Sequence, residues 1–242
     1  LTIDSHSDAP LNIMRRGQNL SVKGDSRKGE SKIDFPRMKE GGLDGIFFAV
    51  YVGQGPRTPE GNEKVRQTAL AIFDSIYAVI NRYPDLVQQG RTADDLRRIN
   101  KSGKLAIFLG IENGYVIGTD IGMLKTYYDL GARYITLCHS YNNDICDSST
   151  DPDGPEHDGL SEFGKEVVRE MNRLGMMVDV SHISDKAFYD VLEMSKAPVI
   201  ASHSSARAIC DHPRNLNDQM LRALSDKNGV IQVCTVSEYI KE

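Results

Sequence analysis

The sequence predicts an α/β fold in which parallel strands close into a TIM-type (β/α)₈ barrel. Two observations lead to this prediction. Short apolar segments alternate with segments whose apolar residues recur at helical spacing, so successive strands would run in the same direction. Histidine or acidic residues also follow several apolar segments directly. Because the carboxyl ends of the strands of a barrel gather on one face, we expect these side chains to converge there.

Seven strands are expected, and each is a short segment with few polar residues. They cover residues 1–5, 45–52, 105–111, 134–138, 176–180, 199–202 and 229–236. A complete barrel needs an eighth strand and helix. We therefore expect residues 1–242 to form a single barrel domain, shortened at its carboxyl end, from which the eighth strand–helix unit is absent.

The longest expected helix covers residues 60–83, where Val65, Ala69 and Ile72 begin a series of apolar residues at three- and four-residue spacing. A shorter helix should begin at Thr92, because Thr92 and Asp95 have the spacing of a capping box. Further helices are expected over residues 120–130, 161–174, 187–194 and 217–227.

A long polar segment, residues 140–159, separates two of the strand–helix units and is rich in Asn, Asp, Ser, Pro and Gly. A loop of this length in a compact domain is typically functional or disordered. Because it follows a strand, we expect it on the same face as the candidate ligands.

The composition argues against several classes of function. The net charge is −5 and the basic residues form no long block, so nucleic acids and anionic membranes are poor candidate partners. No apolar segment approaches the ~18 residues that span a bilayer, and we expect no secretory signal within the chain. The four cysteines form no C-x-x-C pair and are expected to be free, mostly buried thiols.

Five side chains near strand ends have the chemistry of metal ligands. His6 and Asp8 are separated by one residue, which places both on the same side of an extended segment. Glu112 ends an apolar strand, and His182 and His203 follow two consecutive strands. Three imidazoles and two carboxylates suit a pair of divalent metal ions, which a carboxylate can bridge at a separation of ~3.5–4 Å.

Each of these residues taken alone also has an ordinary structural interpretation. A solvated turn is commoner than a metal site for an H-x-D segment, and Glu112 could instead pair with Arg133. His139 also ends a strand, where it could bind a metal or donate a hydrogen bond to a substrate. Arg214 could bind a substrate carboxylate through its planar guanidinium, although a surface arginine is the commoner case.

Eight short segments, in order along the whole chain, carry a more specific signal. They are residues 4–10 (DSHSDAP), 35–42 (FPRMKEGG), 110–114 (GIENG), 136–142 (TLCHSYN), 159–164 (GLSEFG), 178–184 (VDVSHIS), 201–206 (ASHSSA) and 212–215 (HPRN). This ordered set closely resembles the membrane dipeptidase family (renal dipeptidase-like, peptidase family M19) of the amidohydrolase superfamily.

The resemblance implies a site for two divalent metal ions, and the family together with the imidazole content favours Zn²⁺. By the family pattern, His6 and Asp8 would hold one ion. His182 and His203 would hold the other, and Glu112 would bridge the two.

Three further residues match substrate-binding positions of the family. His139 and Arg214 correspond to its substrate-binding histidine and arginine, and Tyr239 to a tyrosine at the edge of the pocket. Two departures stand out. Ser7 replaces the usual asparagine of the first metal motif, which should be harmless because its side chain points away. The chain also stops before strand eight, on which the family carries a proton-shuttling aspartate.

The implied function is hydrolysis of the amide bond of dipeptides by a hydroxide that bridges the two metal ions, with Glu112 and His139 in catalytic roles. The expected partner is a small dipeptide, and the sequence leaves open whether the protein forms a homodimer. Two alternatives also stay open. One is another binuclear amidohydrolase reaction, on a lactone or an acylated amino acid, and the other is a metal-binding relative without activity.

Overall fold

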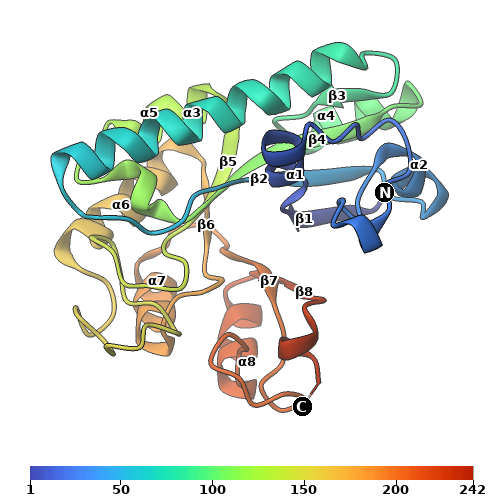
Figure 1. Cartoon of the computed structure of the whole chain (residues 1–242). Coiled ribbons are helices and arrows are strands. Elements are labelled where there is room, and N and C mark those ends of the chain that lie inside the picture. The colour runs from blue at the N-terminus through green and yellow to red at the C-terminus, as the bar shows by residue number, and fades with distance from the viewer. Residues whose placement is uncertain (242) are drawn as a thin grey trace.

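The computed structural model describes residues 1–241, and its strands form one parallel sheet that curves into a nearly closed barrel (Figure 1). In spatial order the strands of the barrel are β1 (Ile3–Ser7), β2 (Gly45–Tyr51), β4 (Leu105–Glu112), β5 (Ala132–Thr136), β6 (Met177–Asp179), β7 (Ile200–Ser204) and β8 (Val230–Val233). The short strand β3 (Val87–Gln89) pairs with the first half of β4 and lies off this path. The expected α/β barrel of seven parallel strands is thus confirmed.

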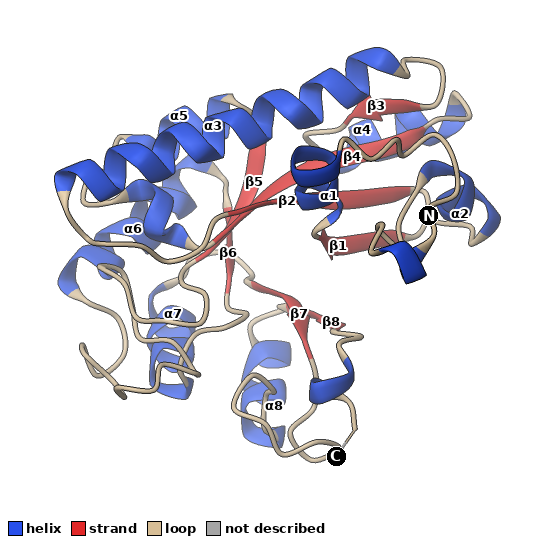
Figure 2. Cartoon of the chain, viewed as in Figure 1, coloured by secondary structure: helices blue, strands red, loops and turns tan. Residues whose placement is uncertain are grey.

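Helices lie in the connections between the strands (Figure 2). They are α1 (Ala9–Arg16), α2 (Phe35–Glu40), α3 (Pro59–Arg82), α4 (Ala93–Lys101), α5 (Met123–Asp129), α6 (Glu162–Leu174), α7 (Asp185–Met194) and α8 (Asp218–Asp226), with single 3-10 turns η1 (Ser26–Lys28), η2 (Gly114–Ile117) and η3 (Ser237–Tyr239). The long helix α3 runs along the outside of the sheet. The capping box expected at Thr92 is present, with reciprocal hydrogen bonds between Thr92 and Asp95.

The structure corrects several expected boundaries. The first strand covers Ile3–Ser7 instead of residues 1–5, so His6 lies inside it. The strand expected over residues 134–138 begins and ends two residues earlier, as Ala132–Thr136. Helices α1 and α2 and strand β3 were not expected, because they are short and their apolar residues are too few to set a clear period.

The long segment of residues 140–159 is an ordered loop. The Asp147 carboxylate accepts hydrogen bonds from the backbone N–H groups of Glu156 (2.8 Å), His157 (2.9 Å) and Gly159 (2.8 Å). Asn143 donates to the carbonyl of Leu137 at 2.9 Å, which ties the loop to the end of β5. Buried side chains therefore supply the hydrogen bonds that a regular strand or helix would otherwise provide.

The first and last strands of the sheet approach each other through side chains. The Ser5 hydroxyl in β1 donates to the carbonyl of Ser202 in β7 at 2.6 Å. From β8, the Gln232 side-chain oxygen accepts the backbone N–H of Ser5 at 2.6 Å, and its amide nitrogen donates to the carbonyl of Ile3 at 3.1 Å. One side-chain amide thus binds the edge of β1 in the way that a peptide group of a neighbouring strand would.

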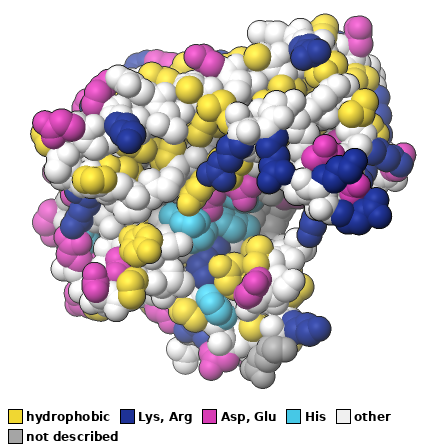
Figure 3. Space-filling model, viewed as in Figure 1, with side chains coloured by type: hydrophobic (Ala, Val, Ile, Leu, Met, Phe, Trp, Pro, Cys, Tyr) yellow, Lys and Arg dark blue, Asp and Glu magenta, His cyan; other side chains and the backbone are white. Residues whose placement is uncertain are grey.

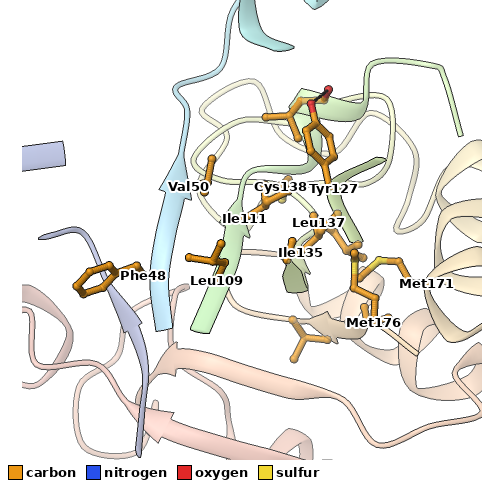
Figure 4. Close-up of a cluster of buried hydrophobic side chains, with 14 of the residues drawn as sticks. Phe48, Val50, Leu109, Ile111, Tyr127, Ile135, Leu137, Cys138, Met171 and Met176 are labelled. Atoms are coloured by element: carbon orange, nitrogen blue, oxygen red, sulfur yellow. Dashed lines mark hydrogen bonds between the residues drawn. The ribbon is translucent and has the colours of Figure 1, made fainter. Parts of the chain in front are cut away.

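The main core fills the space between the sheet and its helices (Figure 4). Strand β4 is buried at every position, as expected for a parallel strand covered on both faces. Its outward residues Leu109 and Ile111 lie in register with Phe48 and Val50 of β2 and pack in this core. Among residues 1–241, no helix is long and apolar enough to cross a membrane.

The opposite face of β4 points into the barrel. Ala106 and Phe108 lie on this face with Phe47 and Tyr134, in a second and smaller apolar cluster. Alternate residues of a strand share a face, so Glu112 lies on the same face as Phe108, closer to the carboxyl ends of the strands. The apolar cluster therefore forms the layer beneath Glu112 in the barrel interior.

Candidate metal centre

Glu112 is the centre of the candidate site. Its side chain is 4 % exposed and ends the strand β4. One carboxylate oxygen, Oε1, lies 3.1 Å from Nε2 of His182, 3.3 Å from Nε2 of His203 and 3.5 Å from Nε2 of His139. The other, Oε2, lies 3.4 Å from Nε2 of His6. Four imidazoles from four strand ends therefore surround one buried carboxylate, and Arg133, the alternative partner, instead donates to backbone carbonyls.

His6 and Asp8 enter the site from the end of β1. Nδ1 of His6 lies 3.0 Å from the hydroxyl oxygen of Tyr134, which leaves Nε2 directed toward Glu112. Asp8 lies just beyond the strand, with one oxygen 3.8 Å from Nε2 of His6 and with 55 % of its side chain exposed. Asp8 is therefore at the rim of the cluster, whereas His6 is inside it.

His182 and His203 meet from the ends of neighbouring strands. Their Nε2 atoms are 2.9 Å apart, and both face Glu112. His182 has a φ of +73°, an unusual backbone conformation for a residue other than glycine, and such strain is commonest at functional sites. Nδ1 of His182 is buried and has no hydrogen-bond partner within residues 1–241.

The pKa values of His6 and Glu112 at the centre are shifted in opposite directions. Burial disfavours the charged form of His6, but Tyr134, Glu112 and Asp8 outweigh this effect, so its pKa lies well above the ordinary value. Burial would also raise the pKa of Glu112. The charge of His6 and its hydrogen bond to the carboxylate instead hold that pKa well below the ordinary value. We therefore expect one ion pair at the centre when no metal is bound.

The other three histidines are neutral in this arrangement. Burial lowers the pKa of His182 far below its ordinary value, with a further contribution from the charge of Arg214. Burial also lowers the pKa values of His203 and His139. A neutral imidazole has a free electron pair, which is the form that binds a metal ion.

Two groups of side chains within the described residues have ligand atoms that all lie within 4.8 Å of one another. One consists of His6, Glu112 and His203, and the other of Glu112, His139 and His182. The rings pair in the same way, since His6 stacks on His203 at 3.8 Å and His139 lies 4.2 Å from His182. Crowded nitrogen and oxygen donors around a shared carboxylate together fit a divalent metal centre.

The structure brings together the side chains that the sequence predicted as metal ligands, with Asp8 at the rim. His203 lies close to both His6, on whose ring it stacks, and His182, whose Nε2 is 2.9 Å from that of His203, and His139 lies beside His182. Glu112 belongs to both groups, which is the arrangement that a bridging role requires.

Arg214 lies beside the centre as a buried cation. It is 3 % exposed, donates to the carbonyl of His203 at 3.0 Å, and has an Nε atom without a partner in the described part of the chain. No carboxylate within residues 1–241 lies in ion-pair distance of it. Burial lowers its pKa, and a buried cation of this kind favours an anionic ligand. Tyr239 packs over Arg214, 5.4 Å from the guanidinium carbon to the ring centre.

A cavity of about 510 Å³ lies over the centre. Figure 3 shows it as a hollow with histidine side chains at its base. Its walls include every site residue expected from the sequence, which are His6, Asp8, Glu112, His139, His182, His203, Arg214 and Tyr239. This volume is sufficient for a small molecule of the size of a dipeptide.

Several residues that contact the site were missed at the level of sequence. Tyr134 supports His6, the ring of Tyr51 lies 4.8 Å from that of His139, and the Ser202 hydroxyl lies 2.8 Å from Nδ1 of His203. Asp179 is fully buried and binds Ser202. Only Asp179 left a signal, because an aspartate within the apolar segment 176–180 is unusual.

Comparisons with known proteins agree with this geometry. The profile of the family described as membrane dipeptidase (Peptidase family M19) matches residues 1–242. The chain is 38% identical over 205 residues to dipeptidase tcpJ of Claviceps purpurea (strain 20.1), which covers 83% of this chain and 48% of that protein. It is 38% identical over 239 residues to dipeptidase verJ of Clonostachys rogersoniana, covering 96% of this chain and 61% of that protein. The chain thus spans about half to three fifths of the length of these relatives.

Solved structures show the same likeness. The probable dipeptidase PvdM from Pseudomonas aeruginosa superimposes with a TM-score of 0.91 at 30% identity, covering 100% of this chain and 61% of that one. A metallo peptidase from Rhodobacter sphaeroides, liganded with a phosphinate mimic of the dipeptide L-Ala-D-Ala, gives a TM-score of 0.87 at 29% identity, covering 100% of this chain and 75% of that one. Sequence, fold and site therefore agree that this chain belongs to the membrane dipeptidase family, peptidase family M19.

Proposed function

We propose that the protein containing this chain is a metal-dependent dipeptidase, which hydrolyses the peptide bond of dipeptides with two divalent ions, most simply Zn²⁺. The observation that carries the proposal is the convergence of four imidazoles on the buried carboxylate of Glu112 at the base of a cavity of about 510 Å³. Family membership and the dipeptide mimic bound by the Rhodobacter sphaeroides relative support it.

We assign the metal-binding role to five residues of the site. His6, Asp8, His182 and His203 would hold the ions, and Glu112 would contact both. When bound, such ions polarise a carbonyl group and make water a nucleophile near neutral pH. The neutral state of His182 and His203 prepares them for this role, whereas His6 would have to release a proton first.

The remaining residues would bind and orient the substrate. We assign the C-terminal carboxylate of the dipeptide to Arg214, because this buried guanidinium has no carboxylate partner in the described residues and keeps an unpaired N–H group. A bidentate contact would fix the register of the peptide over the centre. His139 lines the same cavity, with Nε2 3.5 Å from Oε1 of Glu112, and we assign to it a hydrogen bond to the scissile carbonyl. Tyr239 would close the edge of the pocket.

The proposal is tested with the full-length protein and the dipeptide L-Ala-D-Ala. We expect release of free alanine, loss of activity after dialysis against a chelator, and recovery when Zn²⁺ is added back. Glu112→Gln should abolish the recovery. Glu162→Gln is the matched control, because Glu162 is an exposed carboxylate that pairs with Lys165 and does not line the cavity. No hydrolysis of any free dipeptide by zinc-loaded protein would contradict the proposal.

A further inference from the structure

Asp179 is a buried carboxylate that has no part in the proposed function. It ends strand β6, is fully buried, and lies on the interior side of the barrel. No lysine or arginine within residues 1–241 lies in ion-pair distance of it. A buried carboxylate without a cation is costly unless several hydrogen bonds stabilise it. The hydrogen-bond partners of Asp179 therefore indicate its role.

Four donors from three neighbouring strands bind the two oxygens of Asp179. Oδ1 accepts the backbone N–H groups of Ser181 at 3.0 Å and Ser202 at 2.9 Å. Oδ2 accepts the hydroxyl group of Ser202 at 2.6 Å and that of Thr136. Both oxygens are thus occupied by donors, and in each of these hydrogen bonds the carboxylate is the acceptor.

The Ser202 hydroxyl connects Asp179 to a candidate metal ligand. Its oxygen also lies 2.8 Å from Nδ1 of His203. A hydroxyl group has one hydrogen, and here that hydrogen is donated to Asp179. The Ser202 oxygen can therefore only accept from His203, which places a proton on Nδ1. Nε2 of His203 is left with its electron pair directed at Glu112, 3.3 Å from Oε1.

We propose that Asp179 is a positioning residue which, through the Ser202 hydroxyl, fixes the ring orientation and the tautomer of His203 so that Nε2 is the metal-binding atom. The inference rests on the proposed metal-binding role of His203. Outer hydrogen bonds of this kind hold metal-binding imidazoles in place in many proteins. Among the described residues, His203 is the one imidazole of the cluster whose Nδ1 is linked to a carboxylate through a hydroxyl.

Replacement of Asp179 by asparagine should change the tautomer of His203. The amide oxygen can still accept the backbone N–H groups of Ser181 and Ser202, so the strands stay connected. The amide nitrogen would donate to the Ser202 oxygen, and the Ser202 hydrogen would then point to Nδ1 of His203. The proton of the imidazole would move to Nε2, the atom that should bind the metal.

The experiment combines histidine NMR with metal binding. The metal-free protein is labelled with ¹⁵N-histidine, and the tautomer of His203 is read from its ring nitrogen shifts in the parent and in Asp179→Asn. The dissociation constant for Zn²⁺ is measured by competition with a chromophoric chelator. Thr136→Val is the matched control, because Thr136 donates to the same oxygen of Asp179 but does not contact His203. Ser202→Ala removes the link and leaves the other contacts of Asp179 intact.

We expect the Nδ1–H tautomer of His203 in the parent and in Thr136→Val, and the Nε2–H tautomer in Asp179→Asn. Zinc affinity should fall on the order of 10- to 100-fold in Asp179→Asn and Ser202→Ala, and less than about threefold in Thr136→Val. If Asp179→Asn does not fold, Ser202→Ala decides the affinity comparison. An Nε2–H tautomer in the parent, or equal affinities for Ser202→Ala and Thr136→Val, would overturn the inference. The NMR result does not depend on dipeptide hydrolysis, so failure of the proposed function is recognised separately.

Discussion

Nδ1 of His6 lies 3.0 Å from the hydroxyl oxygen of Tyr134, and this contact joins the metal centre to the apolar layer beneath it. Tyr134 is fully buried and packs against Phe47, with ring centres 5.2 Å apart. Its hydroxyl is thus held at a fixed place in the barrel, and it fixes the orientation of the His6 ring.

Removal of that hydroxyl should weaken the metal centre with little effect on the fold. Tyr134→Phe keeps the ring and loses one hydrogen bond, which is worth about 0.5–1.5 kcal/mol of stability. We expect zinc affinity to fall on the order of tenfold or more, because His6 loses its orienting contact. Chelator competition and urea unfolding measure the two effects. Unchanged affinity would show that Tyr134 does not orient His6.

Gly110→Ala adds only one methyl group, but we expect it to reduce the stability more than Tyr134→Phe does, because it disturbs the packing beneath the centre. A Cβ atom on Gly110 would lie 2.1 Å from Cζ of Tyr134, so Gly110→Ala must displace that ring. We expect a loss of about 1–3 kcal/mol in the free energy of unfolding, together with weaker metal binding. Gly53→Ala is the control, since the nearest atom to its added Cβ is 3.9 Å away. Similar stabilities of the two variants would contradict the packing described for β4 and β5.

The sequence allowed the fold to be predicted because the evidence is local. Strand β4 is a continuous apolar segment, and its burial on both faces follows from that composition. The ligands could be predicted for the same reason, since Glu112 ends this strand and His203 is the next-to-last residue of strand β7. The regular order of strands then placed them on one face.

Other features depend on contacts between residues far apart in the chain. The stacking of His203 on His6 follows from how the strand ends meet around the barrel, and no sequence spacing encodes it. The link from Asp179 to His203 requires the register of β6 and β7, and the contact of Gln232 with β1 joins residues more than 200 positions apart. Short helices such as α1 were missed because local patterns are weak over eight residues.

The metal-free protein should be most stable near neutral pH. His139, His182 and His203 have folded pKa values below their ordinary values. Their contribution to the free energy of unfolding is therefore complete above about pH 6.5 and declines as the pH falls, because the unfolded chain then binds more protons. His6 has a raised pKa, so its contribution is complete below about pH 6.5 and is lost as the pH rises through the folded value.

Urea unfolding of chelator-treated protein between pH 5 and pH 9 measures this profile. We expect the free energy of unfolding to pass through a maximum in this range. His6→Gln should remove the decline at alkaline pH and keep the decline at acidic pH. A stability that rises continuously to pH 9 in the parent would show that His6 is not the charged partner of Glu112.

Recognition of the substrate carboxylate can be separated from catalysis. Arg214→Ala should raise KM for free dipeptides about 10- to 100-fold, since a hydrogen bond to a charged group is worth roughly 1.5–3 kcal/mol. KM for the same dipeptides with an amidated C-terminus should change little. Steady-state kinetics on both substrate series measure the difference, and equal losses in the two series would exclude Arg214 as the carboxylate-binding residue.

We propose that Glu112 is shared by two metal ions. Anomalous diffraction at the zinc edge, from crystals of the zinc-loaded protein, tests it most directly. We expect two peaks per chain, each within about 2.0–2.2 Å of a Glu112 oxygen, one beside His6 and the other beside His182. A single peak, or two peaks of which one does not contact Glu112, would contradict it.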